Sequence, residues 1–173
     1  LFVVFFPQLI AGPIIKYNFF RDQIDGKKVN FFNIDNFIKG AFLFLIGFIK
    51  KVYLANNLSY YVDKGFENLN EINIITAWII SYSFTFQFYF DFSAYVDMAL
   101  GCALMMNIIL PKNFNSPLKA INLIDFWKRW HITLTNFLMN YIYFPLLGVR
   151  QNISFSYSML ITLFVFLLAG FWH

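Results

Sequence analysis

The chain has 173 residues, of which 60% are hydrophobic and only 13% charged, and its formal net charge is +4. Soluble domains carry about 25% charged residues, so these proportions exclude an ordinary soluble protein and favour one whose solvent is lipid. The small basic excess is spread between apolar runs, which fits loops beside a bilayer better than a nucleic-acid interface, so we expect the lipid bilayer and no nucleic acid as a partner.

Apolar runs recur along the chain, and a membrane-spanning helix needs about 20 mostly apolar residues. In chain order, the expected spans are the end of one at 1–12, candidates at 37–61, 72–90 and 92–110, a mixed stretch with Trp and basic residues at 123–147, and the uncharged run 153–172. The candidate at 37–61 contains Lys50 and Lys51, which would have to snorkel or face protein.

No polar loop separates the runs 72–90 and 92–110. They could form a close helical hairpin, or one span followed by a helix in the membrane interface. Lysine and arginine are most frequent in loops 13–36 and 111–130, whereas loop 62–71 is slightly acidic. Because basic loops tend to stay inside, we expect the first two loops to face the cytoplasm and the third to face the outside.

These runs predict an all-α protein that crosses the membrane several times. Transmembrane strands would alternate polar and apolar residues over segments of about 10 positions, and the long runs do not alternate. The chain begins within one apolar run and ends directly after another. We therefore expect 1–173 to be an internal fragment of one multi-pass domain in the inner (plasma) membrane, without a separate soluble domain.

The first histidine lies in a segment with two distinct faces if it is helical. Residues four apart are neighbours on a helix, so Trp127, His131 and Thr135 would share one face. Asp125 and Arg129 would pair on another. An imidazole can take a proton from a hydroxyl near neutral pH, which makes His131 a candidate for general acid–base chemistry. The segment could equally be an interfacial helix with its tryptophans in the aromatic belt.

The second histidine, His173, directly follows the uncharged run 153–172. An ionisable side chain there is a candidate functional residue, although His173 could also be simply the first residue in water. Ala169 and Gly170 are small and would let another helix or a substrate chain approach. Two histidines near one site could activate an alcohol and handle the leaving thiol of a thioester.

Other chemistries gain no support from the sequence. It has no GxSxG nucleophile elbow and no glycine-rich phosphate loop, and the single cysteine, Cys102, excludes a disulfide framework or a zinc site of cysteines. We expect no bound cofactor and no metal. Asp91 and Asp97, six apart on a helix, point roughly 120° apart and are poor candidates for a shared acid–base pair. Each could instead join two helices; we favour this for Asp97 and leave Asp91 open.

Four stretches, in the same order along the chain, together resemble the membrane-bound O-acyltransferase (MBOAT) family. They are FFPQLIAGP at 5–13, QFYFDFSAYVD at 87–97, DFWKRWHITLT at 125–135 and AGFWH at 169–173, with LPKNFNSP at 110–117 also fitting. The first stretch is most similar to the bacterial branch that includes the alginate O-acetylation protein.

The resemblance implies a many-helix membrane enzyme with a buried tunnel. It implies that His173 matches the family's catalytic histidine and His131 its second required histidine. We expect an O-acyltransferase that moves an acyl group, with acetyl favoured, to hydroxyls of a cell-surface or exported polysaccharide. The co-substrate would be an acyl thioester (acetyl-CoA or an acyl carrier), and the acceptor would be the glycan or a periplasmic acyltransferase partner.

Alternative functions remain at this point. One is transfer of D-alanine to a teichoic acid-type polymer. A transporter or flippase would use Asp91, Asp97 and the histidines as a proton relay, and a structural subunit would have no chemistry. Loss of acyl transfer on substitution of His173, with normal membrane insertion, would favour the enzyme.

Overall fold

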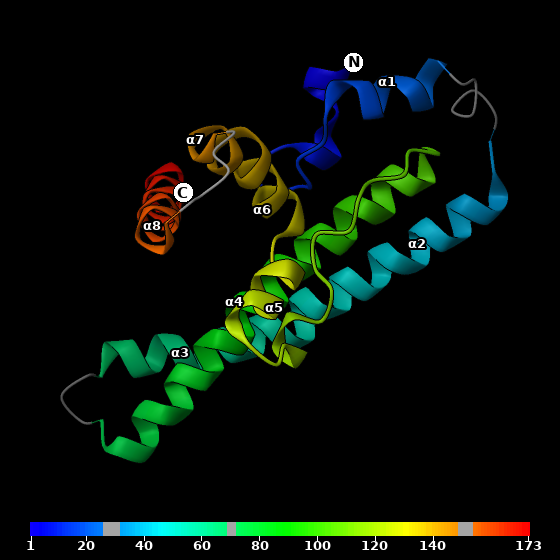
Figure 1. Ribbon diagram of the computed structural model, residues 1–173. Helices are drawn as coiled ribbons and strands as arrows, with labels where there is room; N and C mark the ends of the chain where they lie inside the picture. The colour runs from blue at the N-terminus through cyan, green and yellow to red at the C-terminus, as the bar shows by residue number, and fades with distance from the viewer. Residues whose placement is uncertain (26–31, 69–71, 149–153) are drawn as a thin grey trace. The chain divides into compact units, whose positions relative to one another are not determined.

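The computed structural model describes residues 1–25, 32–68, 72–148 and 154–173. Every regular element in these ranges is a helix, which confirms the all-α expectation (Figure 1). The chain forms two compact units, Leu1–Pro111 and Lys112–His173, which are described separately.

The first unit is built around two long helices. Its elements are η1 (Phe2–Val4), η2 (Phe6–Gln8), α1 (Tyr17–Asp25), α2 (Ile34–Ile49), the π-helical segment η4 (Lys50–Ala55), α3 (Asn56–Glu67) and α4 (Ile74–Met105). An asparagine caps each long helix: Asn33 Oδ1 accepts from the N–H of Asn36 before α2, and Asn73 Oδ1 accepts from the N–H of Thr76 before α4. These caps satisfy donors that the first helical turn leaves without a backbone acceptor.

Small residues bring α2 and α4 into close antiparallel contact, and Figure 1 shows the two helices side by side. A methyl group on Gly40 would lie 2.6 Å from the carbonyl oxygen of Gly101, and one on Gly47 would lie 2.7 Å from that of Ala94. No larger side chain fits at these two glycines. Small residues that let backbones approach are typical of helix pairs in membranes, where the hydrophobic effect does not drive helices together.

Lys50 and Lys51, at the start of η4, face α4. Lys50 Nζ lies 2.5 Å from Asp97 Oδ2, and Lys51 Nζ pairs with Asp91 Oδ1. The lysines thus face protein, one of the two outcomes expected for them. Asp97 thus joins α4 to η4, as the sequence favoured, and Asp91, whose role was left open, joins the same two elements.

The stretch 72–110 differs from both arrangements expected for it. It contains one continuous helix, α4, of 32 residues, and no close hairpin. At 1.5 Å per residue this helix is about 48 Å long. It continues because neither proline nor glycine occurs between Ile74 and Leu100. The loop expected at 62–71 is also shorter, since α3 extends to Glu67.

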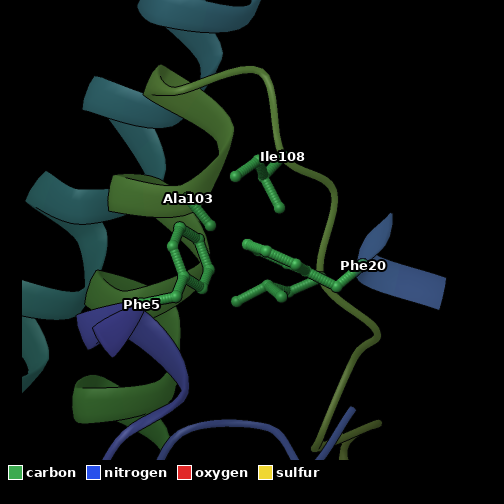
Figure 2. Packing of buried hydrophobic residues seen from close by; sticks show 5 residues of the cluster. Phe5, Phe20, Ala103 and Ile108 are labelled. Carbon is green, nitrogen blue, oxygen red and sulfur yellow. The ribbon is translucent and has the colours of Figure 1, made fainter. Parts of the chain in front are cut away.

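The N-terminal segment is not the α-helical end of a span. It forms two 3-10 turns, the second of which contains Pro7, and a proline ring disrupts a helix interior. The segment packs into the main apolar cluster of the unit, where the rings of Phe5 and Phe20 lie 4.9 Å apart. Figure 2 shows this cluster at the end of α4; its buried members are Phe5, Phe20, Ala103, Ile108 and Leu110.

The second unit consists of short helices and one long apolar helix. Its elements are η6 (Pro117–Lys119), α5 (Leu123–Arg129), α6 (Ile132–Leu138), the π-helical segment η7 (Met139–Tyr143), α7 (Phe144–Leu147) and α8 (Phe155–Trp172). Among helices in the described ranges, α8 alone is long and apolar enough to cross a membrane. It falls on the run 153–172 that the sequence marked most clearly.

Candidate functional site

His131 lies at a break between α5 and α6. Its backbone is left-handed, with φ 41° and ψ 54°. For residues other than glycine this conformation costs on the order of 1–3 kcal/mol and persists only where the surroundings enforce it. The chain turns at this residue, so the expectation that Trp127, His131 and Thr135 share one helical face is wrong.

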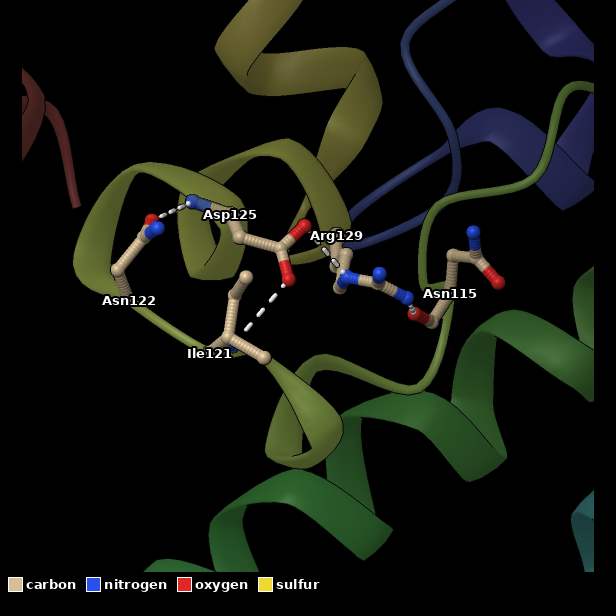
Figure 3. A network of polar contacts seen from close by, with 5 residues as sticks. All are labelled: Asn115, Ile121, Asn122, Asp125 and Arg129. Atoms are coloured by element: carbon tan, nitrogen blue, oxygen red, sulfur yellow. Dashed lines mark hydrogen bonds and ion pairs between the residues drawn. The ribbon is translucent and has the colours of Figure 1, made fainter.

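The loop before α5 holds this turn in place. The N–H of Asn115 donates to the carbonyl of Arg129, and the N–H of Ile132 donates to that of Asn113, both at 2.9 Å. In Figure 3 the guanidinium of Arg129 bridges α5 and the loop: Nε donates to Asp125 Oδ1 at 2.8 Å and Nη1 to the carbonyl of Asn115 at 3.4 Å. The expected pairing of Asp125 with Arg129 is therefore confirmed, and this bond holds the pKa of Asp125 below its usual value.

The side chain of His131 is buried among an amide and a hydroxyl. Its Nδ1 lies 3.1 Å from Asn113 Oδ1. The same oxygen accepts hydrogen bonds from the backbone N–H and the hydroxyl of Thr133, at 3.1 and 2.9 Å. Asn113 is fully buried, and His131 and Thr133 are each 7% exposed. The ring is thus seated in a dry polar cluster where neutral groups contact it directly.

Burial makes His131 a neutral imidazole. Loss of solvent lowers the pKa of His131 from 6.5 to about 4, and the charge of His173 acts in the same direction. The two histidines therefore lie close enough within the second unit for a charge on His173 to affect His131. A neutral ring can accept a hydrogen bond from a hydroxyl or donate one to a carbonyl, but it does not readily keep a proton.

His173 lies at the C-terminal end of α8 and is exposed. Its Nδ1 lies 2.6 Å from the carbonyl oxygen of Ala169, one turn earlier. Because a carbonyl only accepts, Nδ1 carries a proton and Nε2 is the basic nitrogen of the neutral ring. Within the described residues, a methyl group on Gly170 would meet no atom within 4 Å.

Sequence reasoning identified both histidines but missed the residues that hold His131. Asn113 lies 18 positions before His131 and 20 positions before Thr133 along the chain, so no helical or strand periodicity links it to them. The only hint of Asn113 in the sequence was its place between the two prolines of PKNFNSP. That composition predicts a loop and does not predict a buried side chain.

The whole chain, residues 1–173, matches the model of the MBOAT, membrane-bound O-acyltransferase, family. It is 50% identical over 173 residues to a peptidoglycan O-acetyltransferase of Helicobacter pylori, covering 100% of this chain and 32% of that protein. It is 40% identical over 172 residues to a probable alginate O-acetylase AlgI of Azotobacter vinelandii, covering 99% of this chain and 33% of that protein. A teichoic acid D-alanyltransferase of Bacillus subtilis is more distant, at 26% identity over 182 residues, covering 99% of this chain and 45% of that protein.

The fold and the site define a class of protein: a helical membrane protein with two histidines in one compact unit. The chain belongs to the membrane-bound O-acyltransferase family. It spans about a third of the length of the first two relatives named above.

Proposed function

We propose that this chain is the histidine-bearing part of a multi-pass membrane enzyme that transfers an acetyl group to hydroxyls of a cell-envelope polysaccharide. The observation that carries the proposal is His131, a buried neutral imidazole held in a strained turn near a second histidine. Family membership supports O-acyl transfer, and the names of the two more similar relatives support acetyl as the group and a glycan as the acceptor.

His173 acts as the general base in this proposal. Its Nε2 takes the proton from the acceptor hydroxyl, and the resulting oxygen attacks the carbonyl carbon of the acyl thioester. When the tetrahedral intermediate collapses, the C–S bond breaks and the sulfur leaves as a thiol with the proton that His173 returns. General-base assistance of this kind contributes about 10²–10⁴-fold to the rate.

His131 orients a reactant instead of carrying the proton. Its lowered pKa disfavours an imidazolium, so the ring suits a hydrogen bond to the acceptor hydroxyl or to the donor carbonyl. An alternative role for His173 is to take the acyl group itself before passing it on. Rapid quenching with labelled donor and no acceptor distinguishes the two: a labelled acyl-histidine that forms and decays at the turnover rate would replace the direct-attack mechanism.

Substitution in the full-length protein tests the enzyme proposal. His173→Gln should lower acyl transfer by about 10²–10⁴-fold, measured in membranes with a radiolabelled acetyl donor, because the base is lost. Ser158→Ala is a matched control on the same helix, since its hydroxyl donates to the backbone carbonyl of Phe155. Normal transfer by His173→Gln at equal membrane levels would contradict the proposal. A transporter would instead move substrate without a covalent product.

The full-length protein is further proposed to cross the inner membrane several times. The glycine contacts between α2 and α4 suit helices surrounded by lipid, and so do the ion pairs of the lysines in η4 with the aspartates in α4. The placement of Lys and Arg supports an orientation with the loop that contains α1 in the cytoplasm and the end of α3 in the periplasm.

Cysteine labelling tests this orientation. With Cys102 replaced by alanine, an impermeant thiol reagent added to intact cells should label a cysteine at Asn68 but not one at Asp22. Permeabilised cells should show labelling at both positions, which controls for reactivity. The reverse pattern in intact cells would overturn the orientation, and labelling of both positions would contradict a membrane between them.

D-Alanyl transfer to teichoic acid is a second candidate function, supported by the more distant B. subtilis relative. A competition assay with an acetyl thioester and a D-alanyl thioester separates the two, because the proposal expects transfer of acetyl in preference to D-alanyl. The acceptor is either the glycan or a periplasmic acyltransferase partner that passes the group on, and labelled protein before labelled glycan would indicate the partner.

A further inference from the structure

The loop 113–115 does more than hold the turn at His131, because one of its side chains contacts the ring directly. Asn113 Oδ1 is the meeting point of three polar contacts, to His131 Nδ1 and to the backbone and side chain of Thr133. Which atom of the amide occupies this position follows from the partners. A backbone N–H can only donate, so the atom facing the N–H of Thr133 must be an acceptor.

The orientation of the amide in turn fixes the proton on His131. An amide oxygen only accepts, so the imidazole nitrogen that faces it, Nδ1, must donate. In the neutral ring the other nitrogen, Nε2, is then unprotonated and basic. The backbone N–H of Thr133 thus sets the amide of Asn113, and the amide sets the tautomer of His131.

The other end of the amide supports this assignment. Asn113 is 0% exposed, and its Nδ2 has no hydrogen-bond partner among the described residues. Turning the amide over would place Nδ2 against the N–H of Thr133 and against its hydroxyl, and would remove the shared acceptor. The three contacts to Oδ1 therefore stabilise this orientation of the amide by more than the unpaired Nδ2 costs. The oxygen is the atom through which Asn113 acts on His131.

We propose that Asn113 is a positioning residue that fixes the Nδ1–H tautomer and the orientation of His131, so that Nε2 is presented to the reactants as a hydrogen-bond acceptor. This proposal rests on the function proposed for His131. Nε2 of His131 then accepts a hydrogen bond from the hydroxyl of the acceptor substrate. Of the two roles given above, this keeps the contact with the hydroxyl and excludes the contact with the donor carbonyl.

The tautomer can be measured without turnover. Full-length protein with ¹⁵N-histidine, reconstituted in bilayers, gives separate solid-state NMR signals for protonated and unprotonated ring nitrogens, and His131→Gln identifies the signals of this residue. We expect an unprotonated Nε2 in the wild type and in Asn113→Asp, which keeps the acceptor. Asn113→Leu should lose this preference. A wild-type ring protonated at Nε2 would overturn the proposal.

Activity gives the second readout. Asn113→Leu should lower kcat by about 10–100-fold, as when partners that orient metal-bound histidines are removed, and Asn113→Asp should retain more activity than Asn113→Leu at equal protein levels. Asn115→Ala is the matched control, because Asn115 is exposed in the same loop and uses its backbone for the contacts to Arg129. Equal losses in the Asp and Leu variants, with an unchanged tautomer in both, would leave Asn113 with a packing role only.

The two readouts separate this inference from the proposed function. If His131→Gln keeps full acyl transfer, the function proposed for His131 is wrong. The NMR measurement still tests independently whether Asn113 fixes the tautomer of the ring. If His131→Gln is inactive but the Asn113→Leu ring keeps Nδ1–H, the positioning role fails and the function of His131 survives.

Discussion

The two units of the chain place polar groups in apolar surroundings by different means. Between η4 and α4, full charges are paired: Lys50 with Asp97 and Lys51 with Asp91, all of them at least 20% exposed at the side chain. Around His131 the groups are neutral and nearly dry. Paired charges cancel one another and hold helices together, whereas a neutral imidazole in a fixed tautomer has one protonated and one basic nitrogen. Under the function proposed above, the first set has a structural role and the second a chemical one.

The two units should differ most in how a fall in pH changes the stability of the protein. The folded site lowers the pKa of His131 from 6.5 to about 4. Between these two pH values the unfolded state binds a proton at His131 and the folded state does not. The stability from this difference is fully present above pH 6.5 and is lost as the pH falls through this range toward 4. The loss is on the order of 3 kcal/mol.

Thermal unfolding of detergent-solubilised full-length protein across this pH range would measure that loss, with His131→Asn as comparison because asparagine tolerates the left-handed backbone. We expect the acid sensitivity to shrink in His131→Asn. His131→Val should also unfold more easily at every pH, because a β-branched residue is strained at φ 41°. An acid response equal in wild type and His131→Asn would remove the contrast between the units.

The contact between α2 and α4 in the first unit should be destabilised by a larger side chain and not by a fall in pH. Gly40→Ala places a methyl group 2.6 Å from the carbonyl oxygen of Gly101, and this atom belongs to the backbone, so α2 and α4 must separate. Overpacking of this kind costs about 1–3 kcal/mol. Gly65→Ala is the control, since its methyl group would meet the movable side-chain end of Ile80. A smaller fall in thermal stability for Gly40→Ala than for Gly65→Ala would contradict the close contact.

The smallest effect is expected for the charge pair. Lys50→Met should destabilise the protein by about 1–2 kcal/mol, since the carboxylate of Asp97 loses the group that joins α4 to η4. The double variant Lys50→Met with Asp97→Leu should recover most of this loss, because no unpaired charge remains. Acyl transfer by the double variant should stay close to that of the wild type. A loss as large as that of His173→Gln would give these charges a part in the chemistry and revive the proton relay.

The sequence was sufficient for the features that depend on local composition. The helical class, the apolar run at α8 and the pairing of Asp125 with Arg129 follow from residue type and spacing. The choice of the two histidines as candidate site residues came from residue type alone and stays a prediction. The continuous helix α4 was not foreseen, because the stretch 72–110 was divided into two runs that are each about as long as one membrane crossing. Nothing between Ile74 and Leu100 breaks the helix, which is why it continues.

The geometry of the candidate site depended on contacts that spacing does not encode. The turn at His131 is enforced by hydrogen bonds from the loop at Asn113 and Asn115, and the local sequence around His131 contains neither proline nor glycine to announce it. Asn113 itself reads as a loop residue, and its burial arises only once the chain folds back on this loop. Residue identity thus indicated where chemistry could occur, but tertiary contacts decided which face His131 presents.

The π-helical segment η4 has a consequence for how the chain tolerates changes in length. In a π turn the N–H bonds to the carbonyl five residues earlier, as the N–H of Asn56 does to Lys51, so each turn accommodates an extra residue. Removing one residue between Lys50 and Ala55 would let the ordinary helical pattern run through. Because the π turn holds about one residue more than an α turn, this deletion would leave the orientation of α2 relative to α3 nearly unchanged. The same deletion inside α2 would instead rotate the residues that follow it by about 100° around the helix axis, so η4 is where this part of the chain best tolerates the loss of one residue.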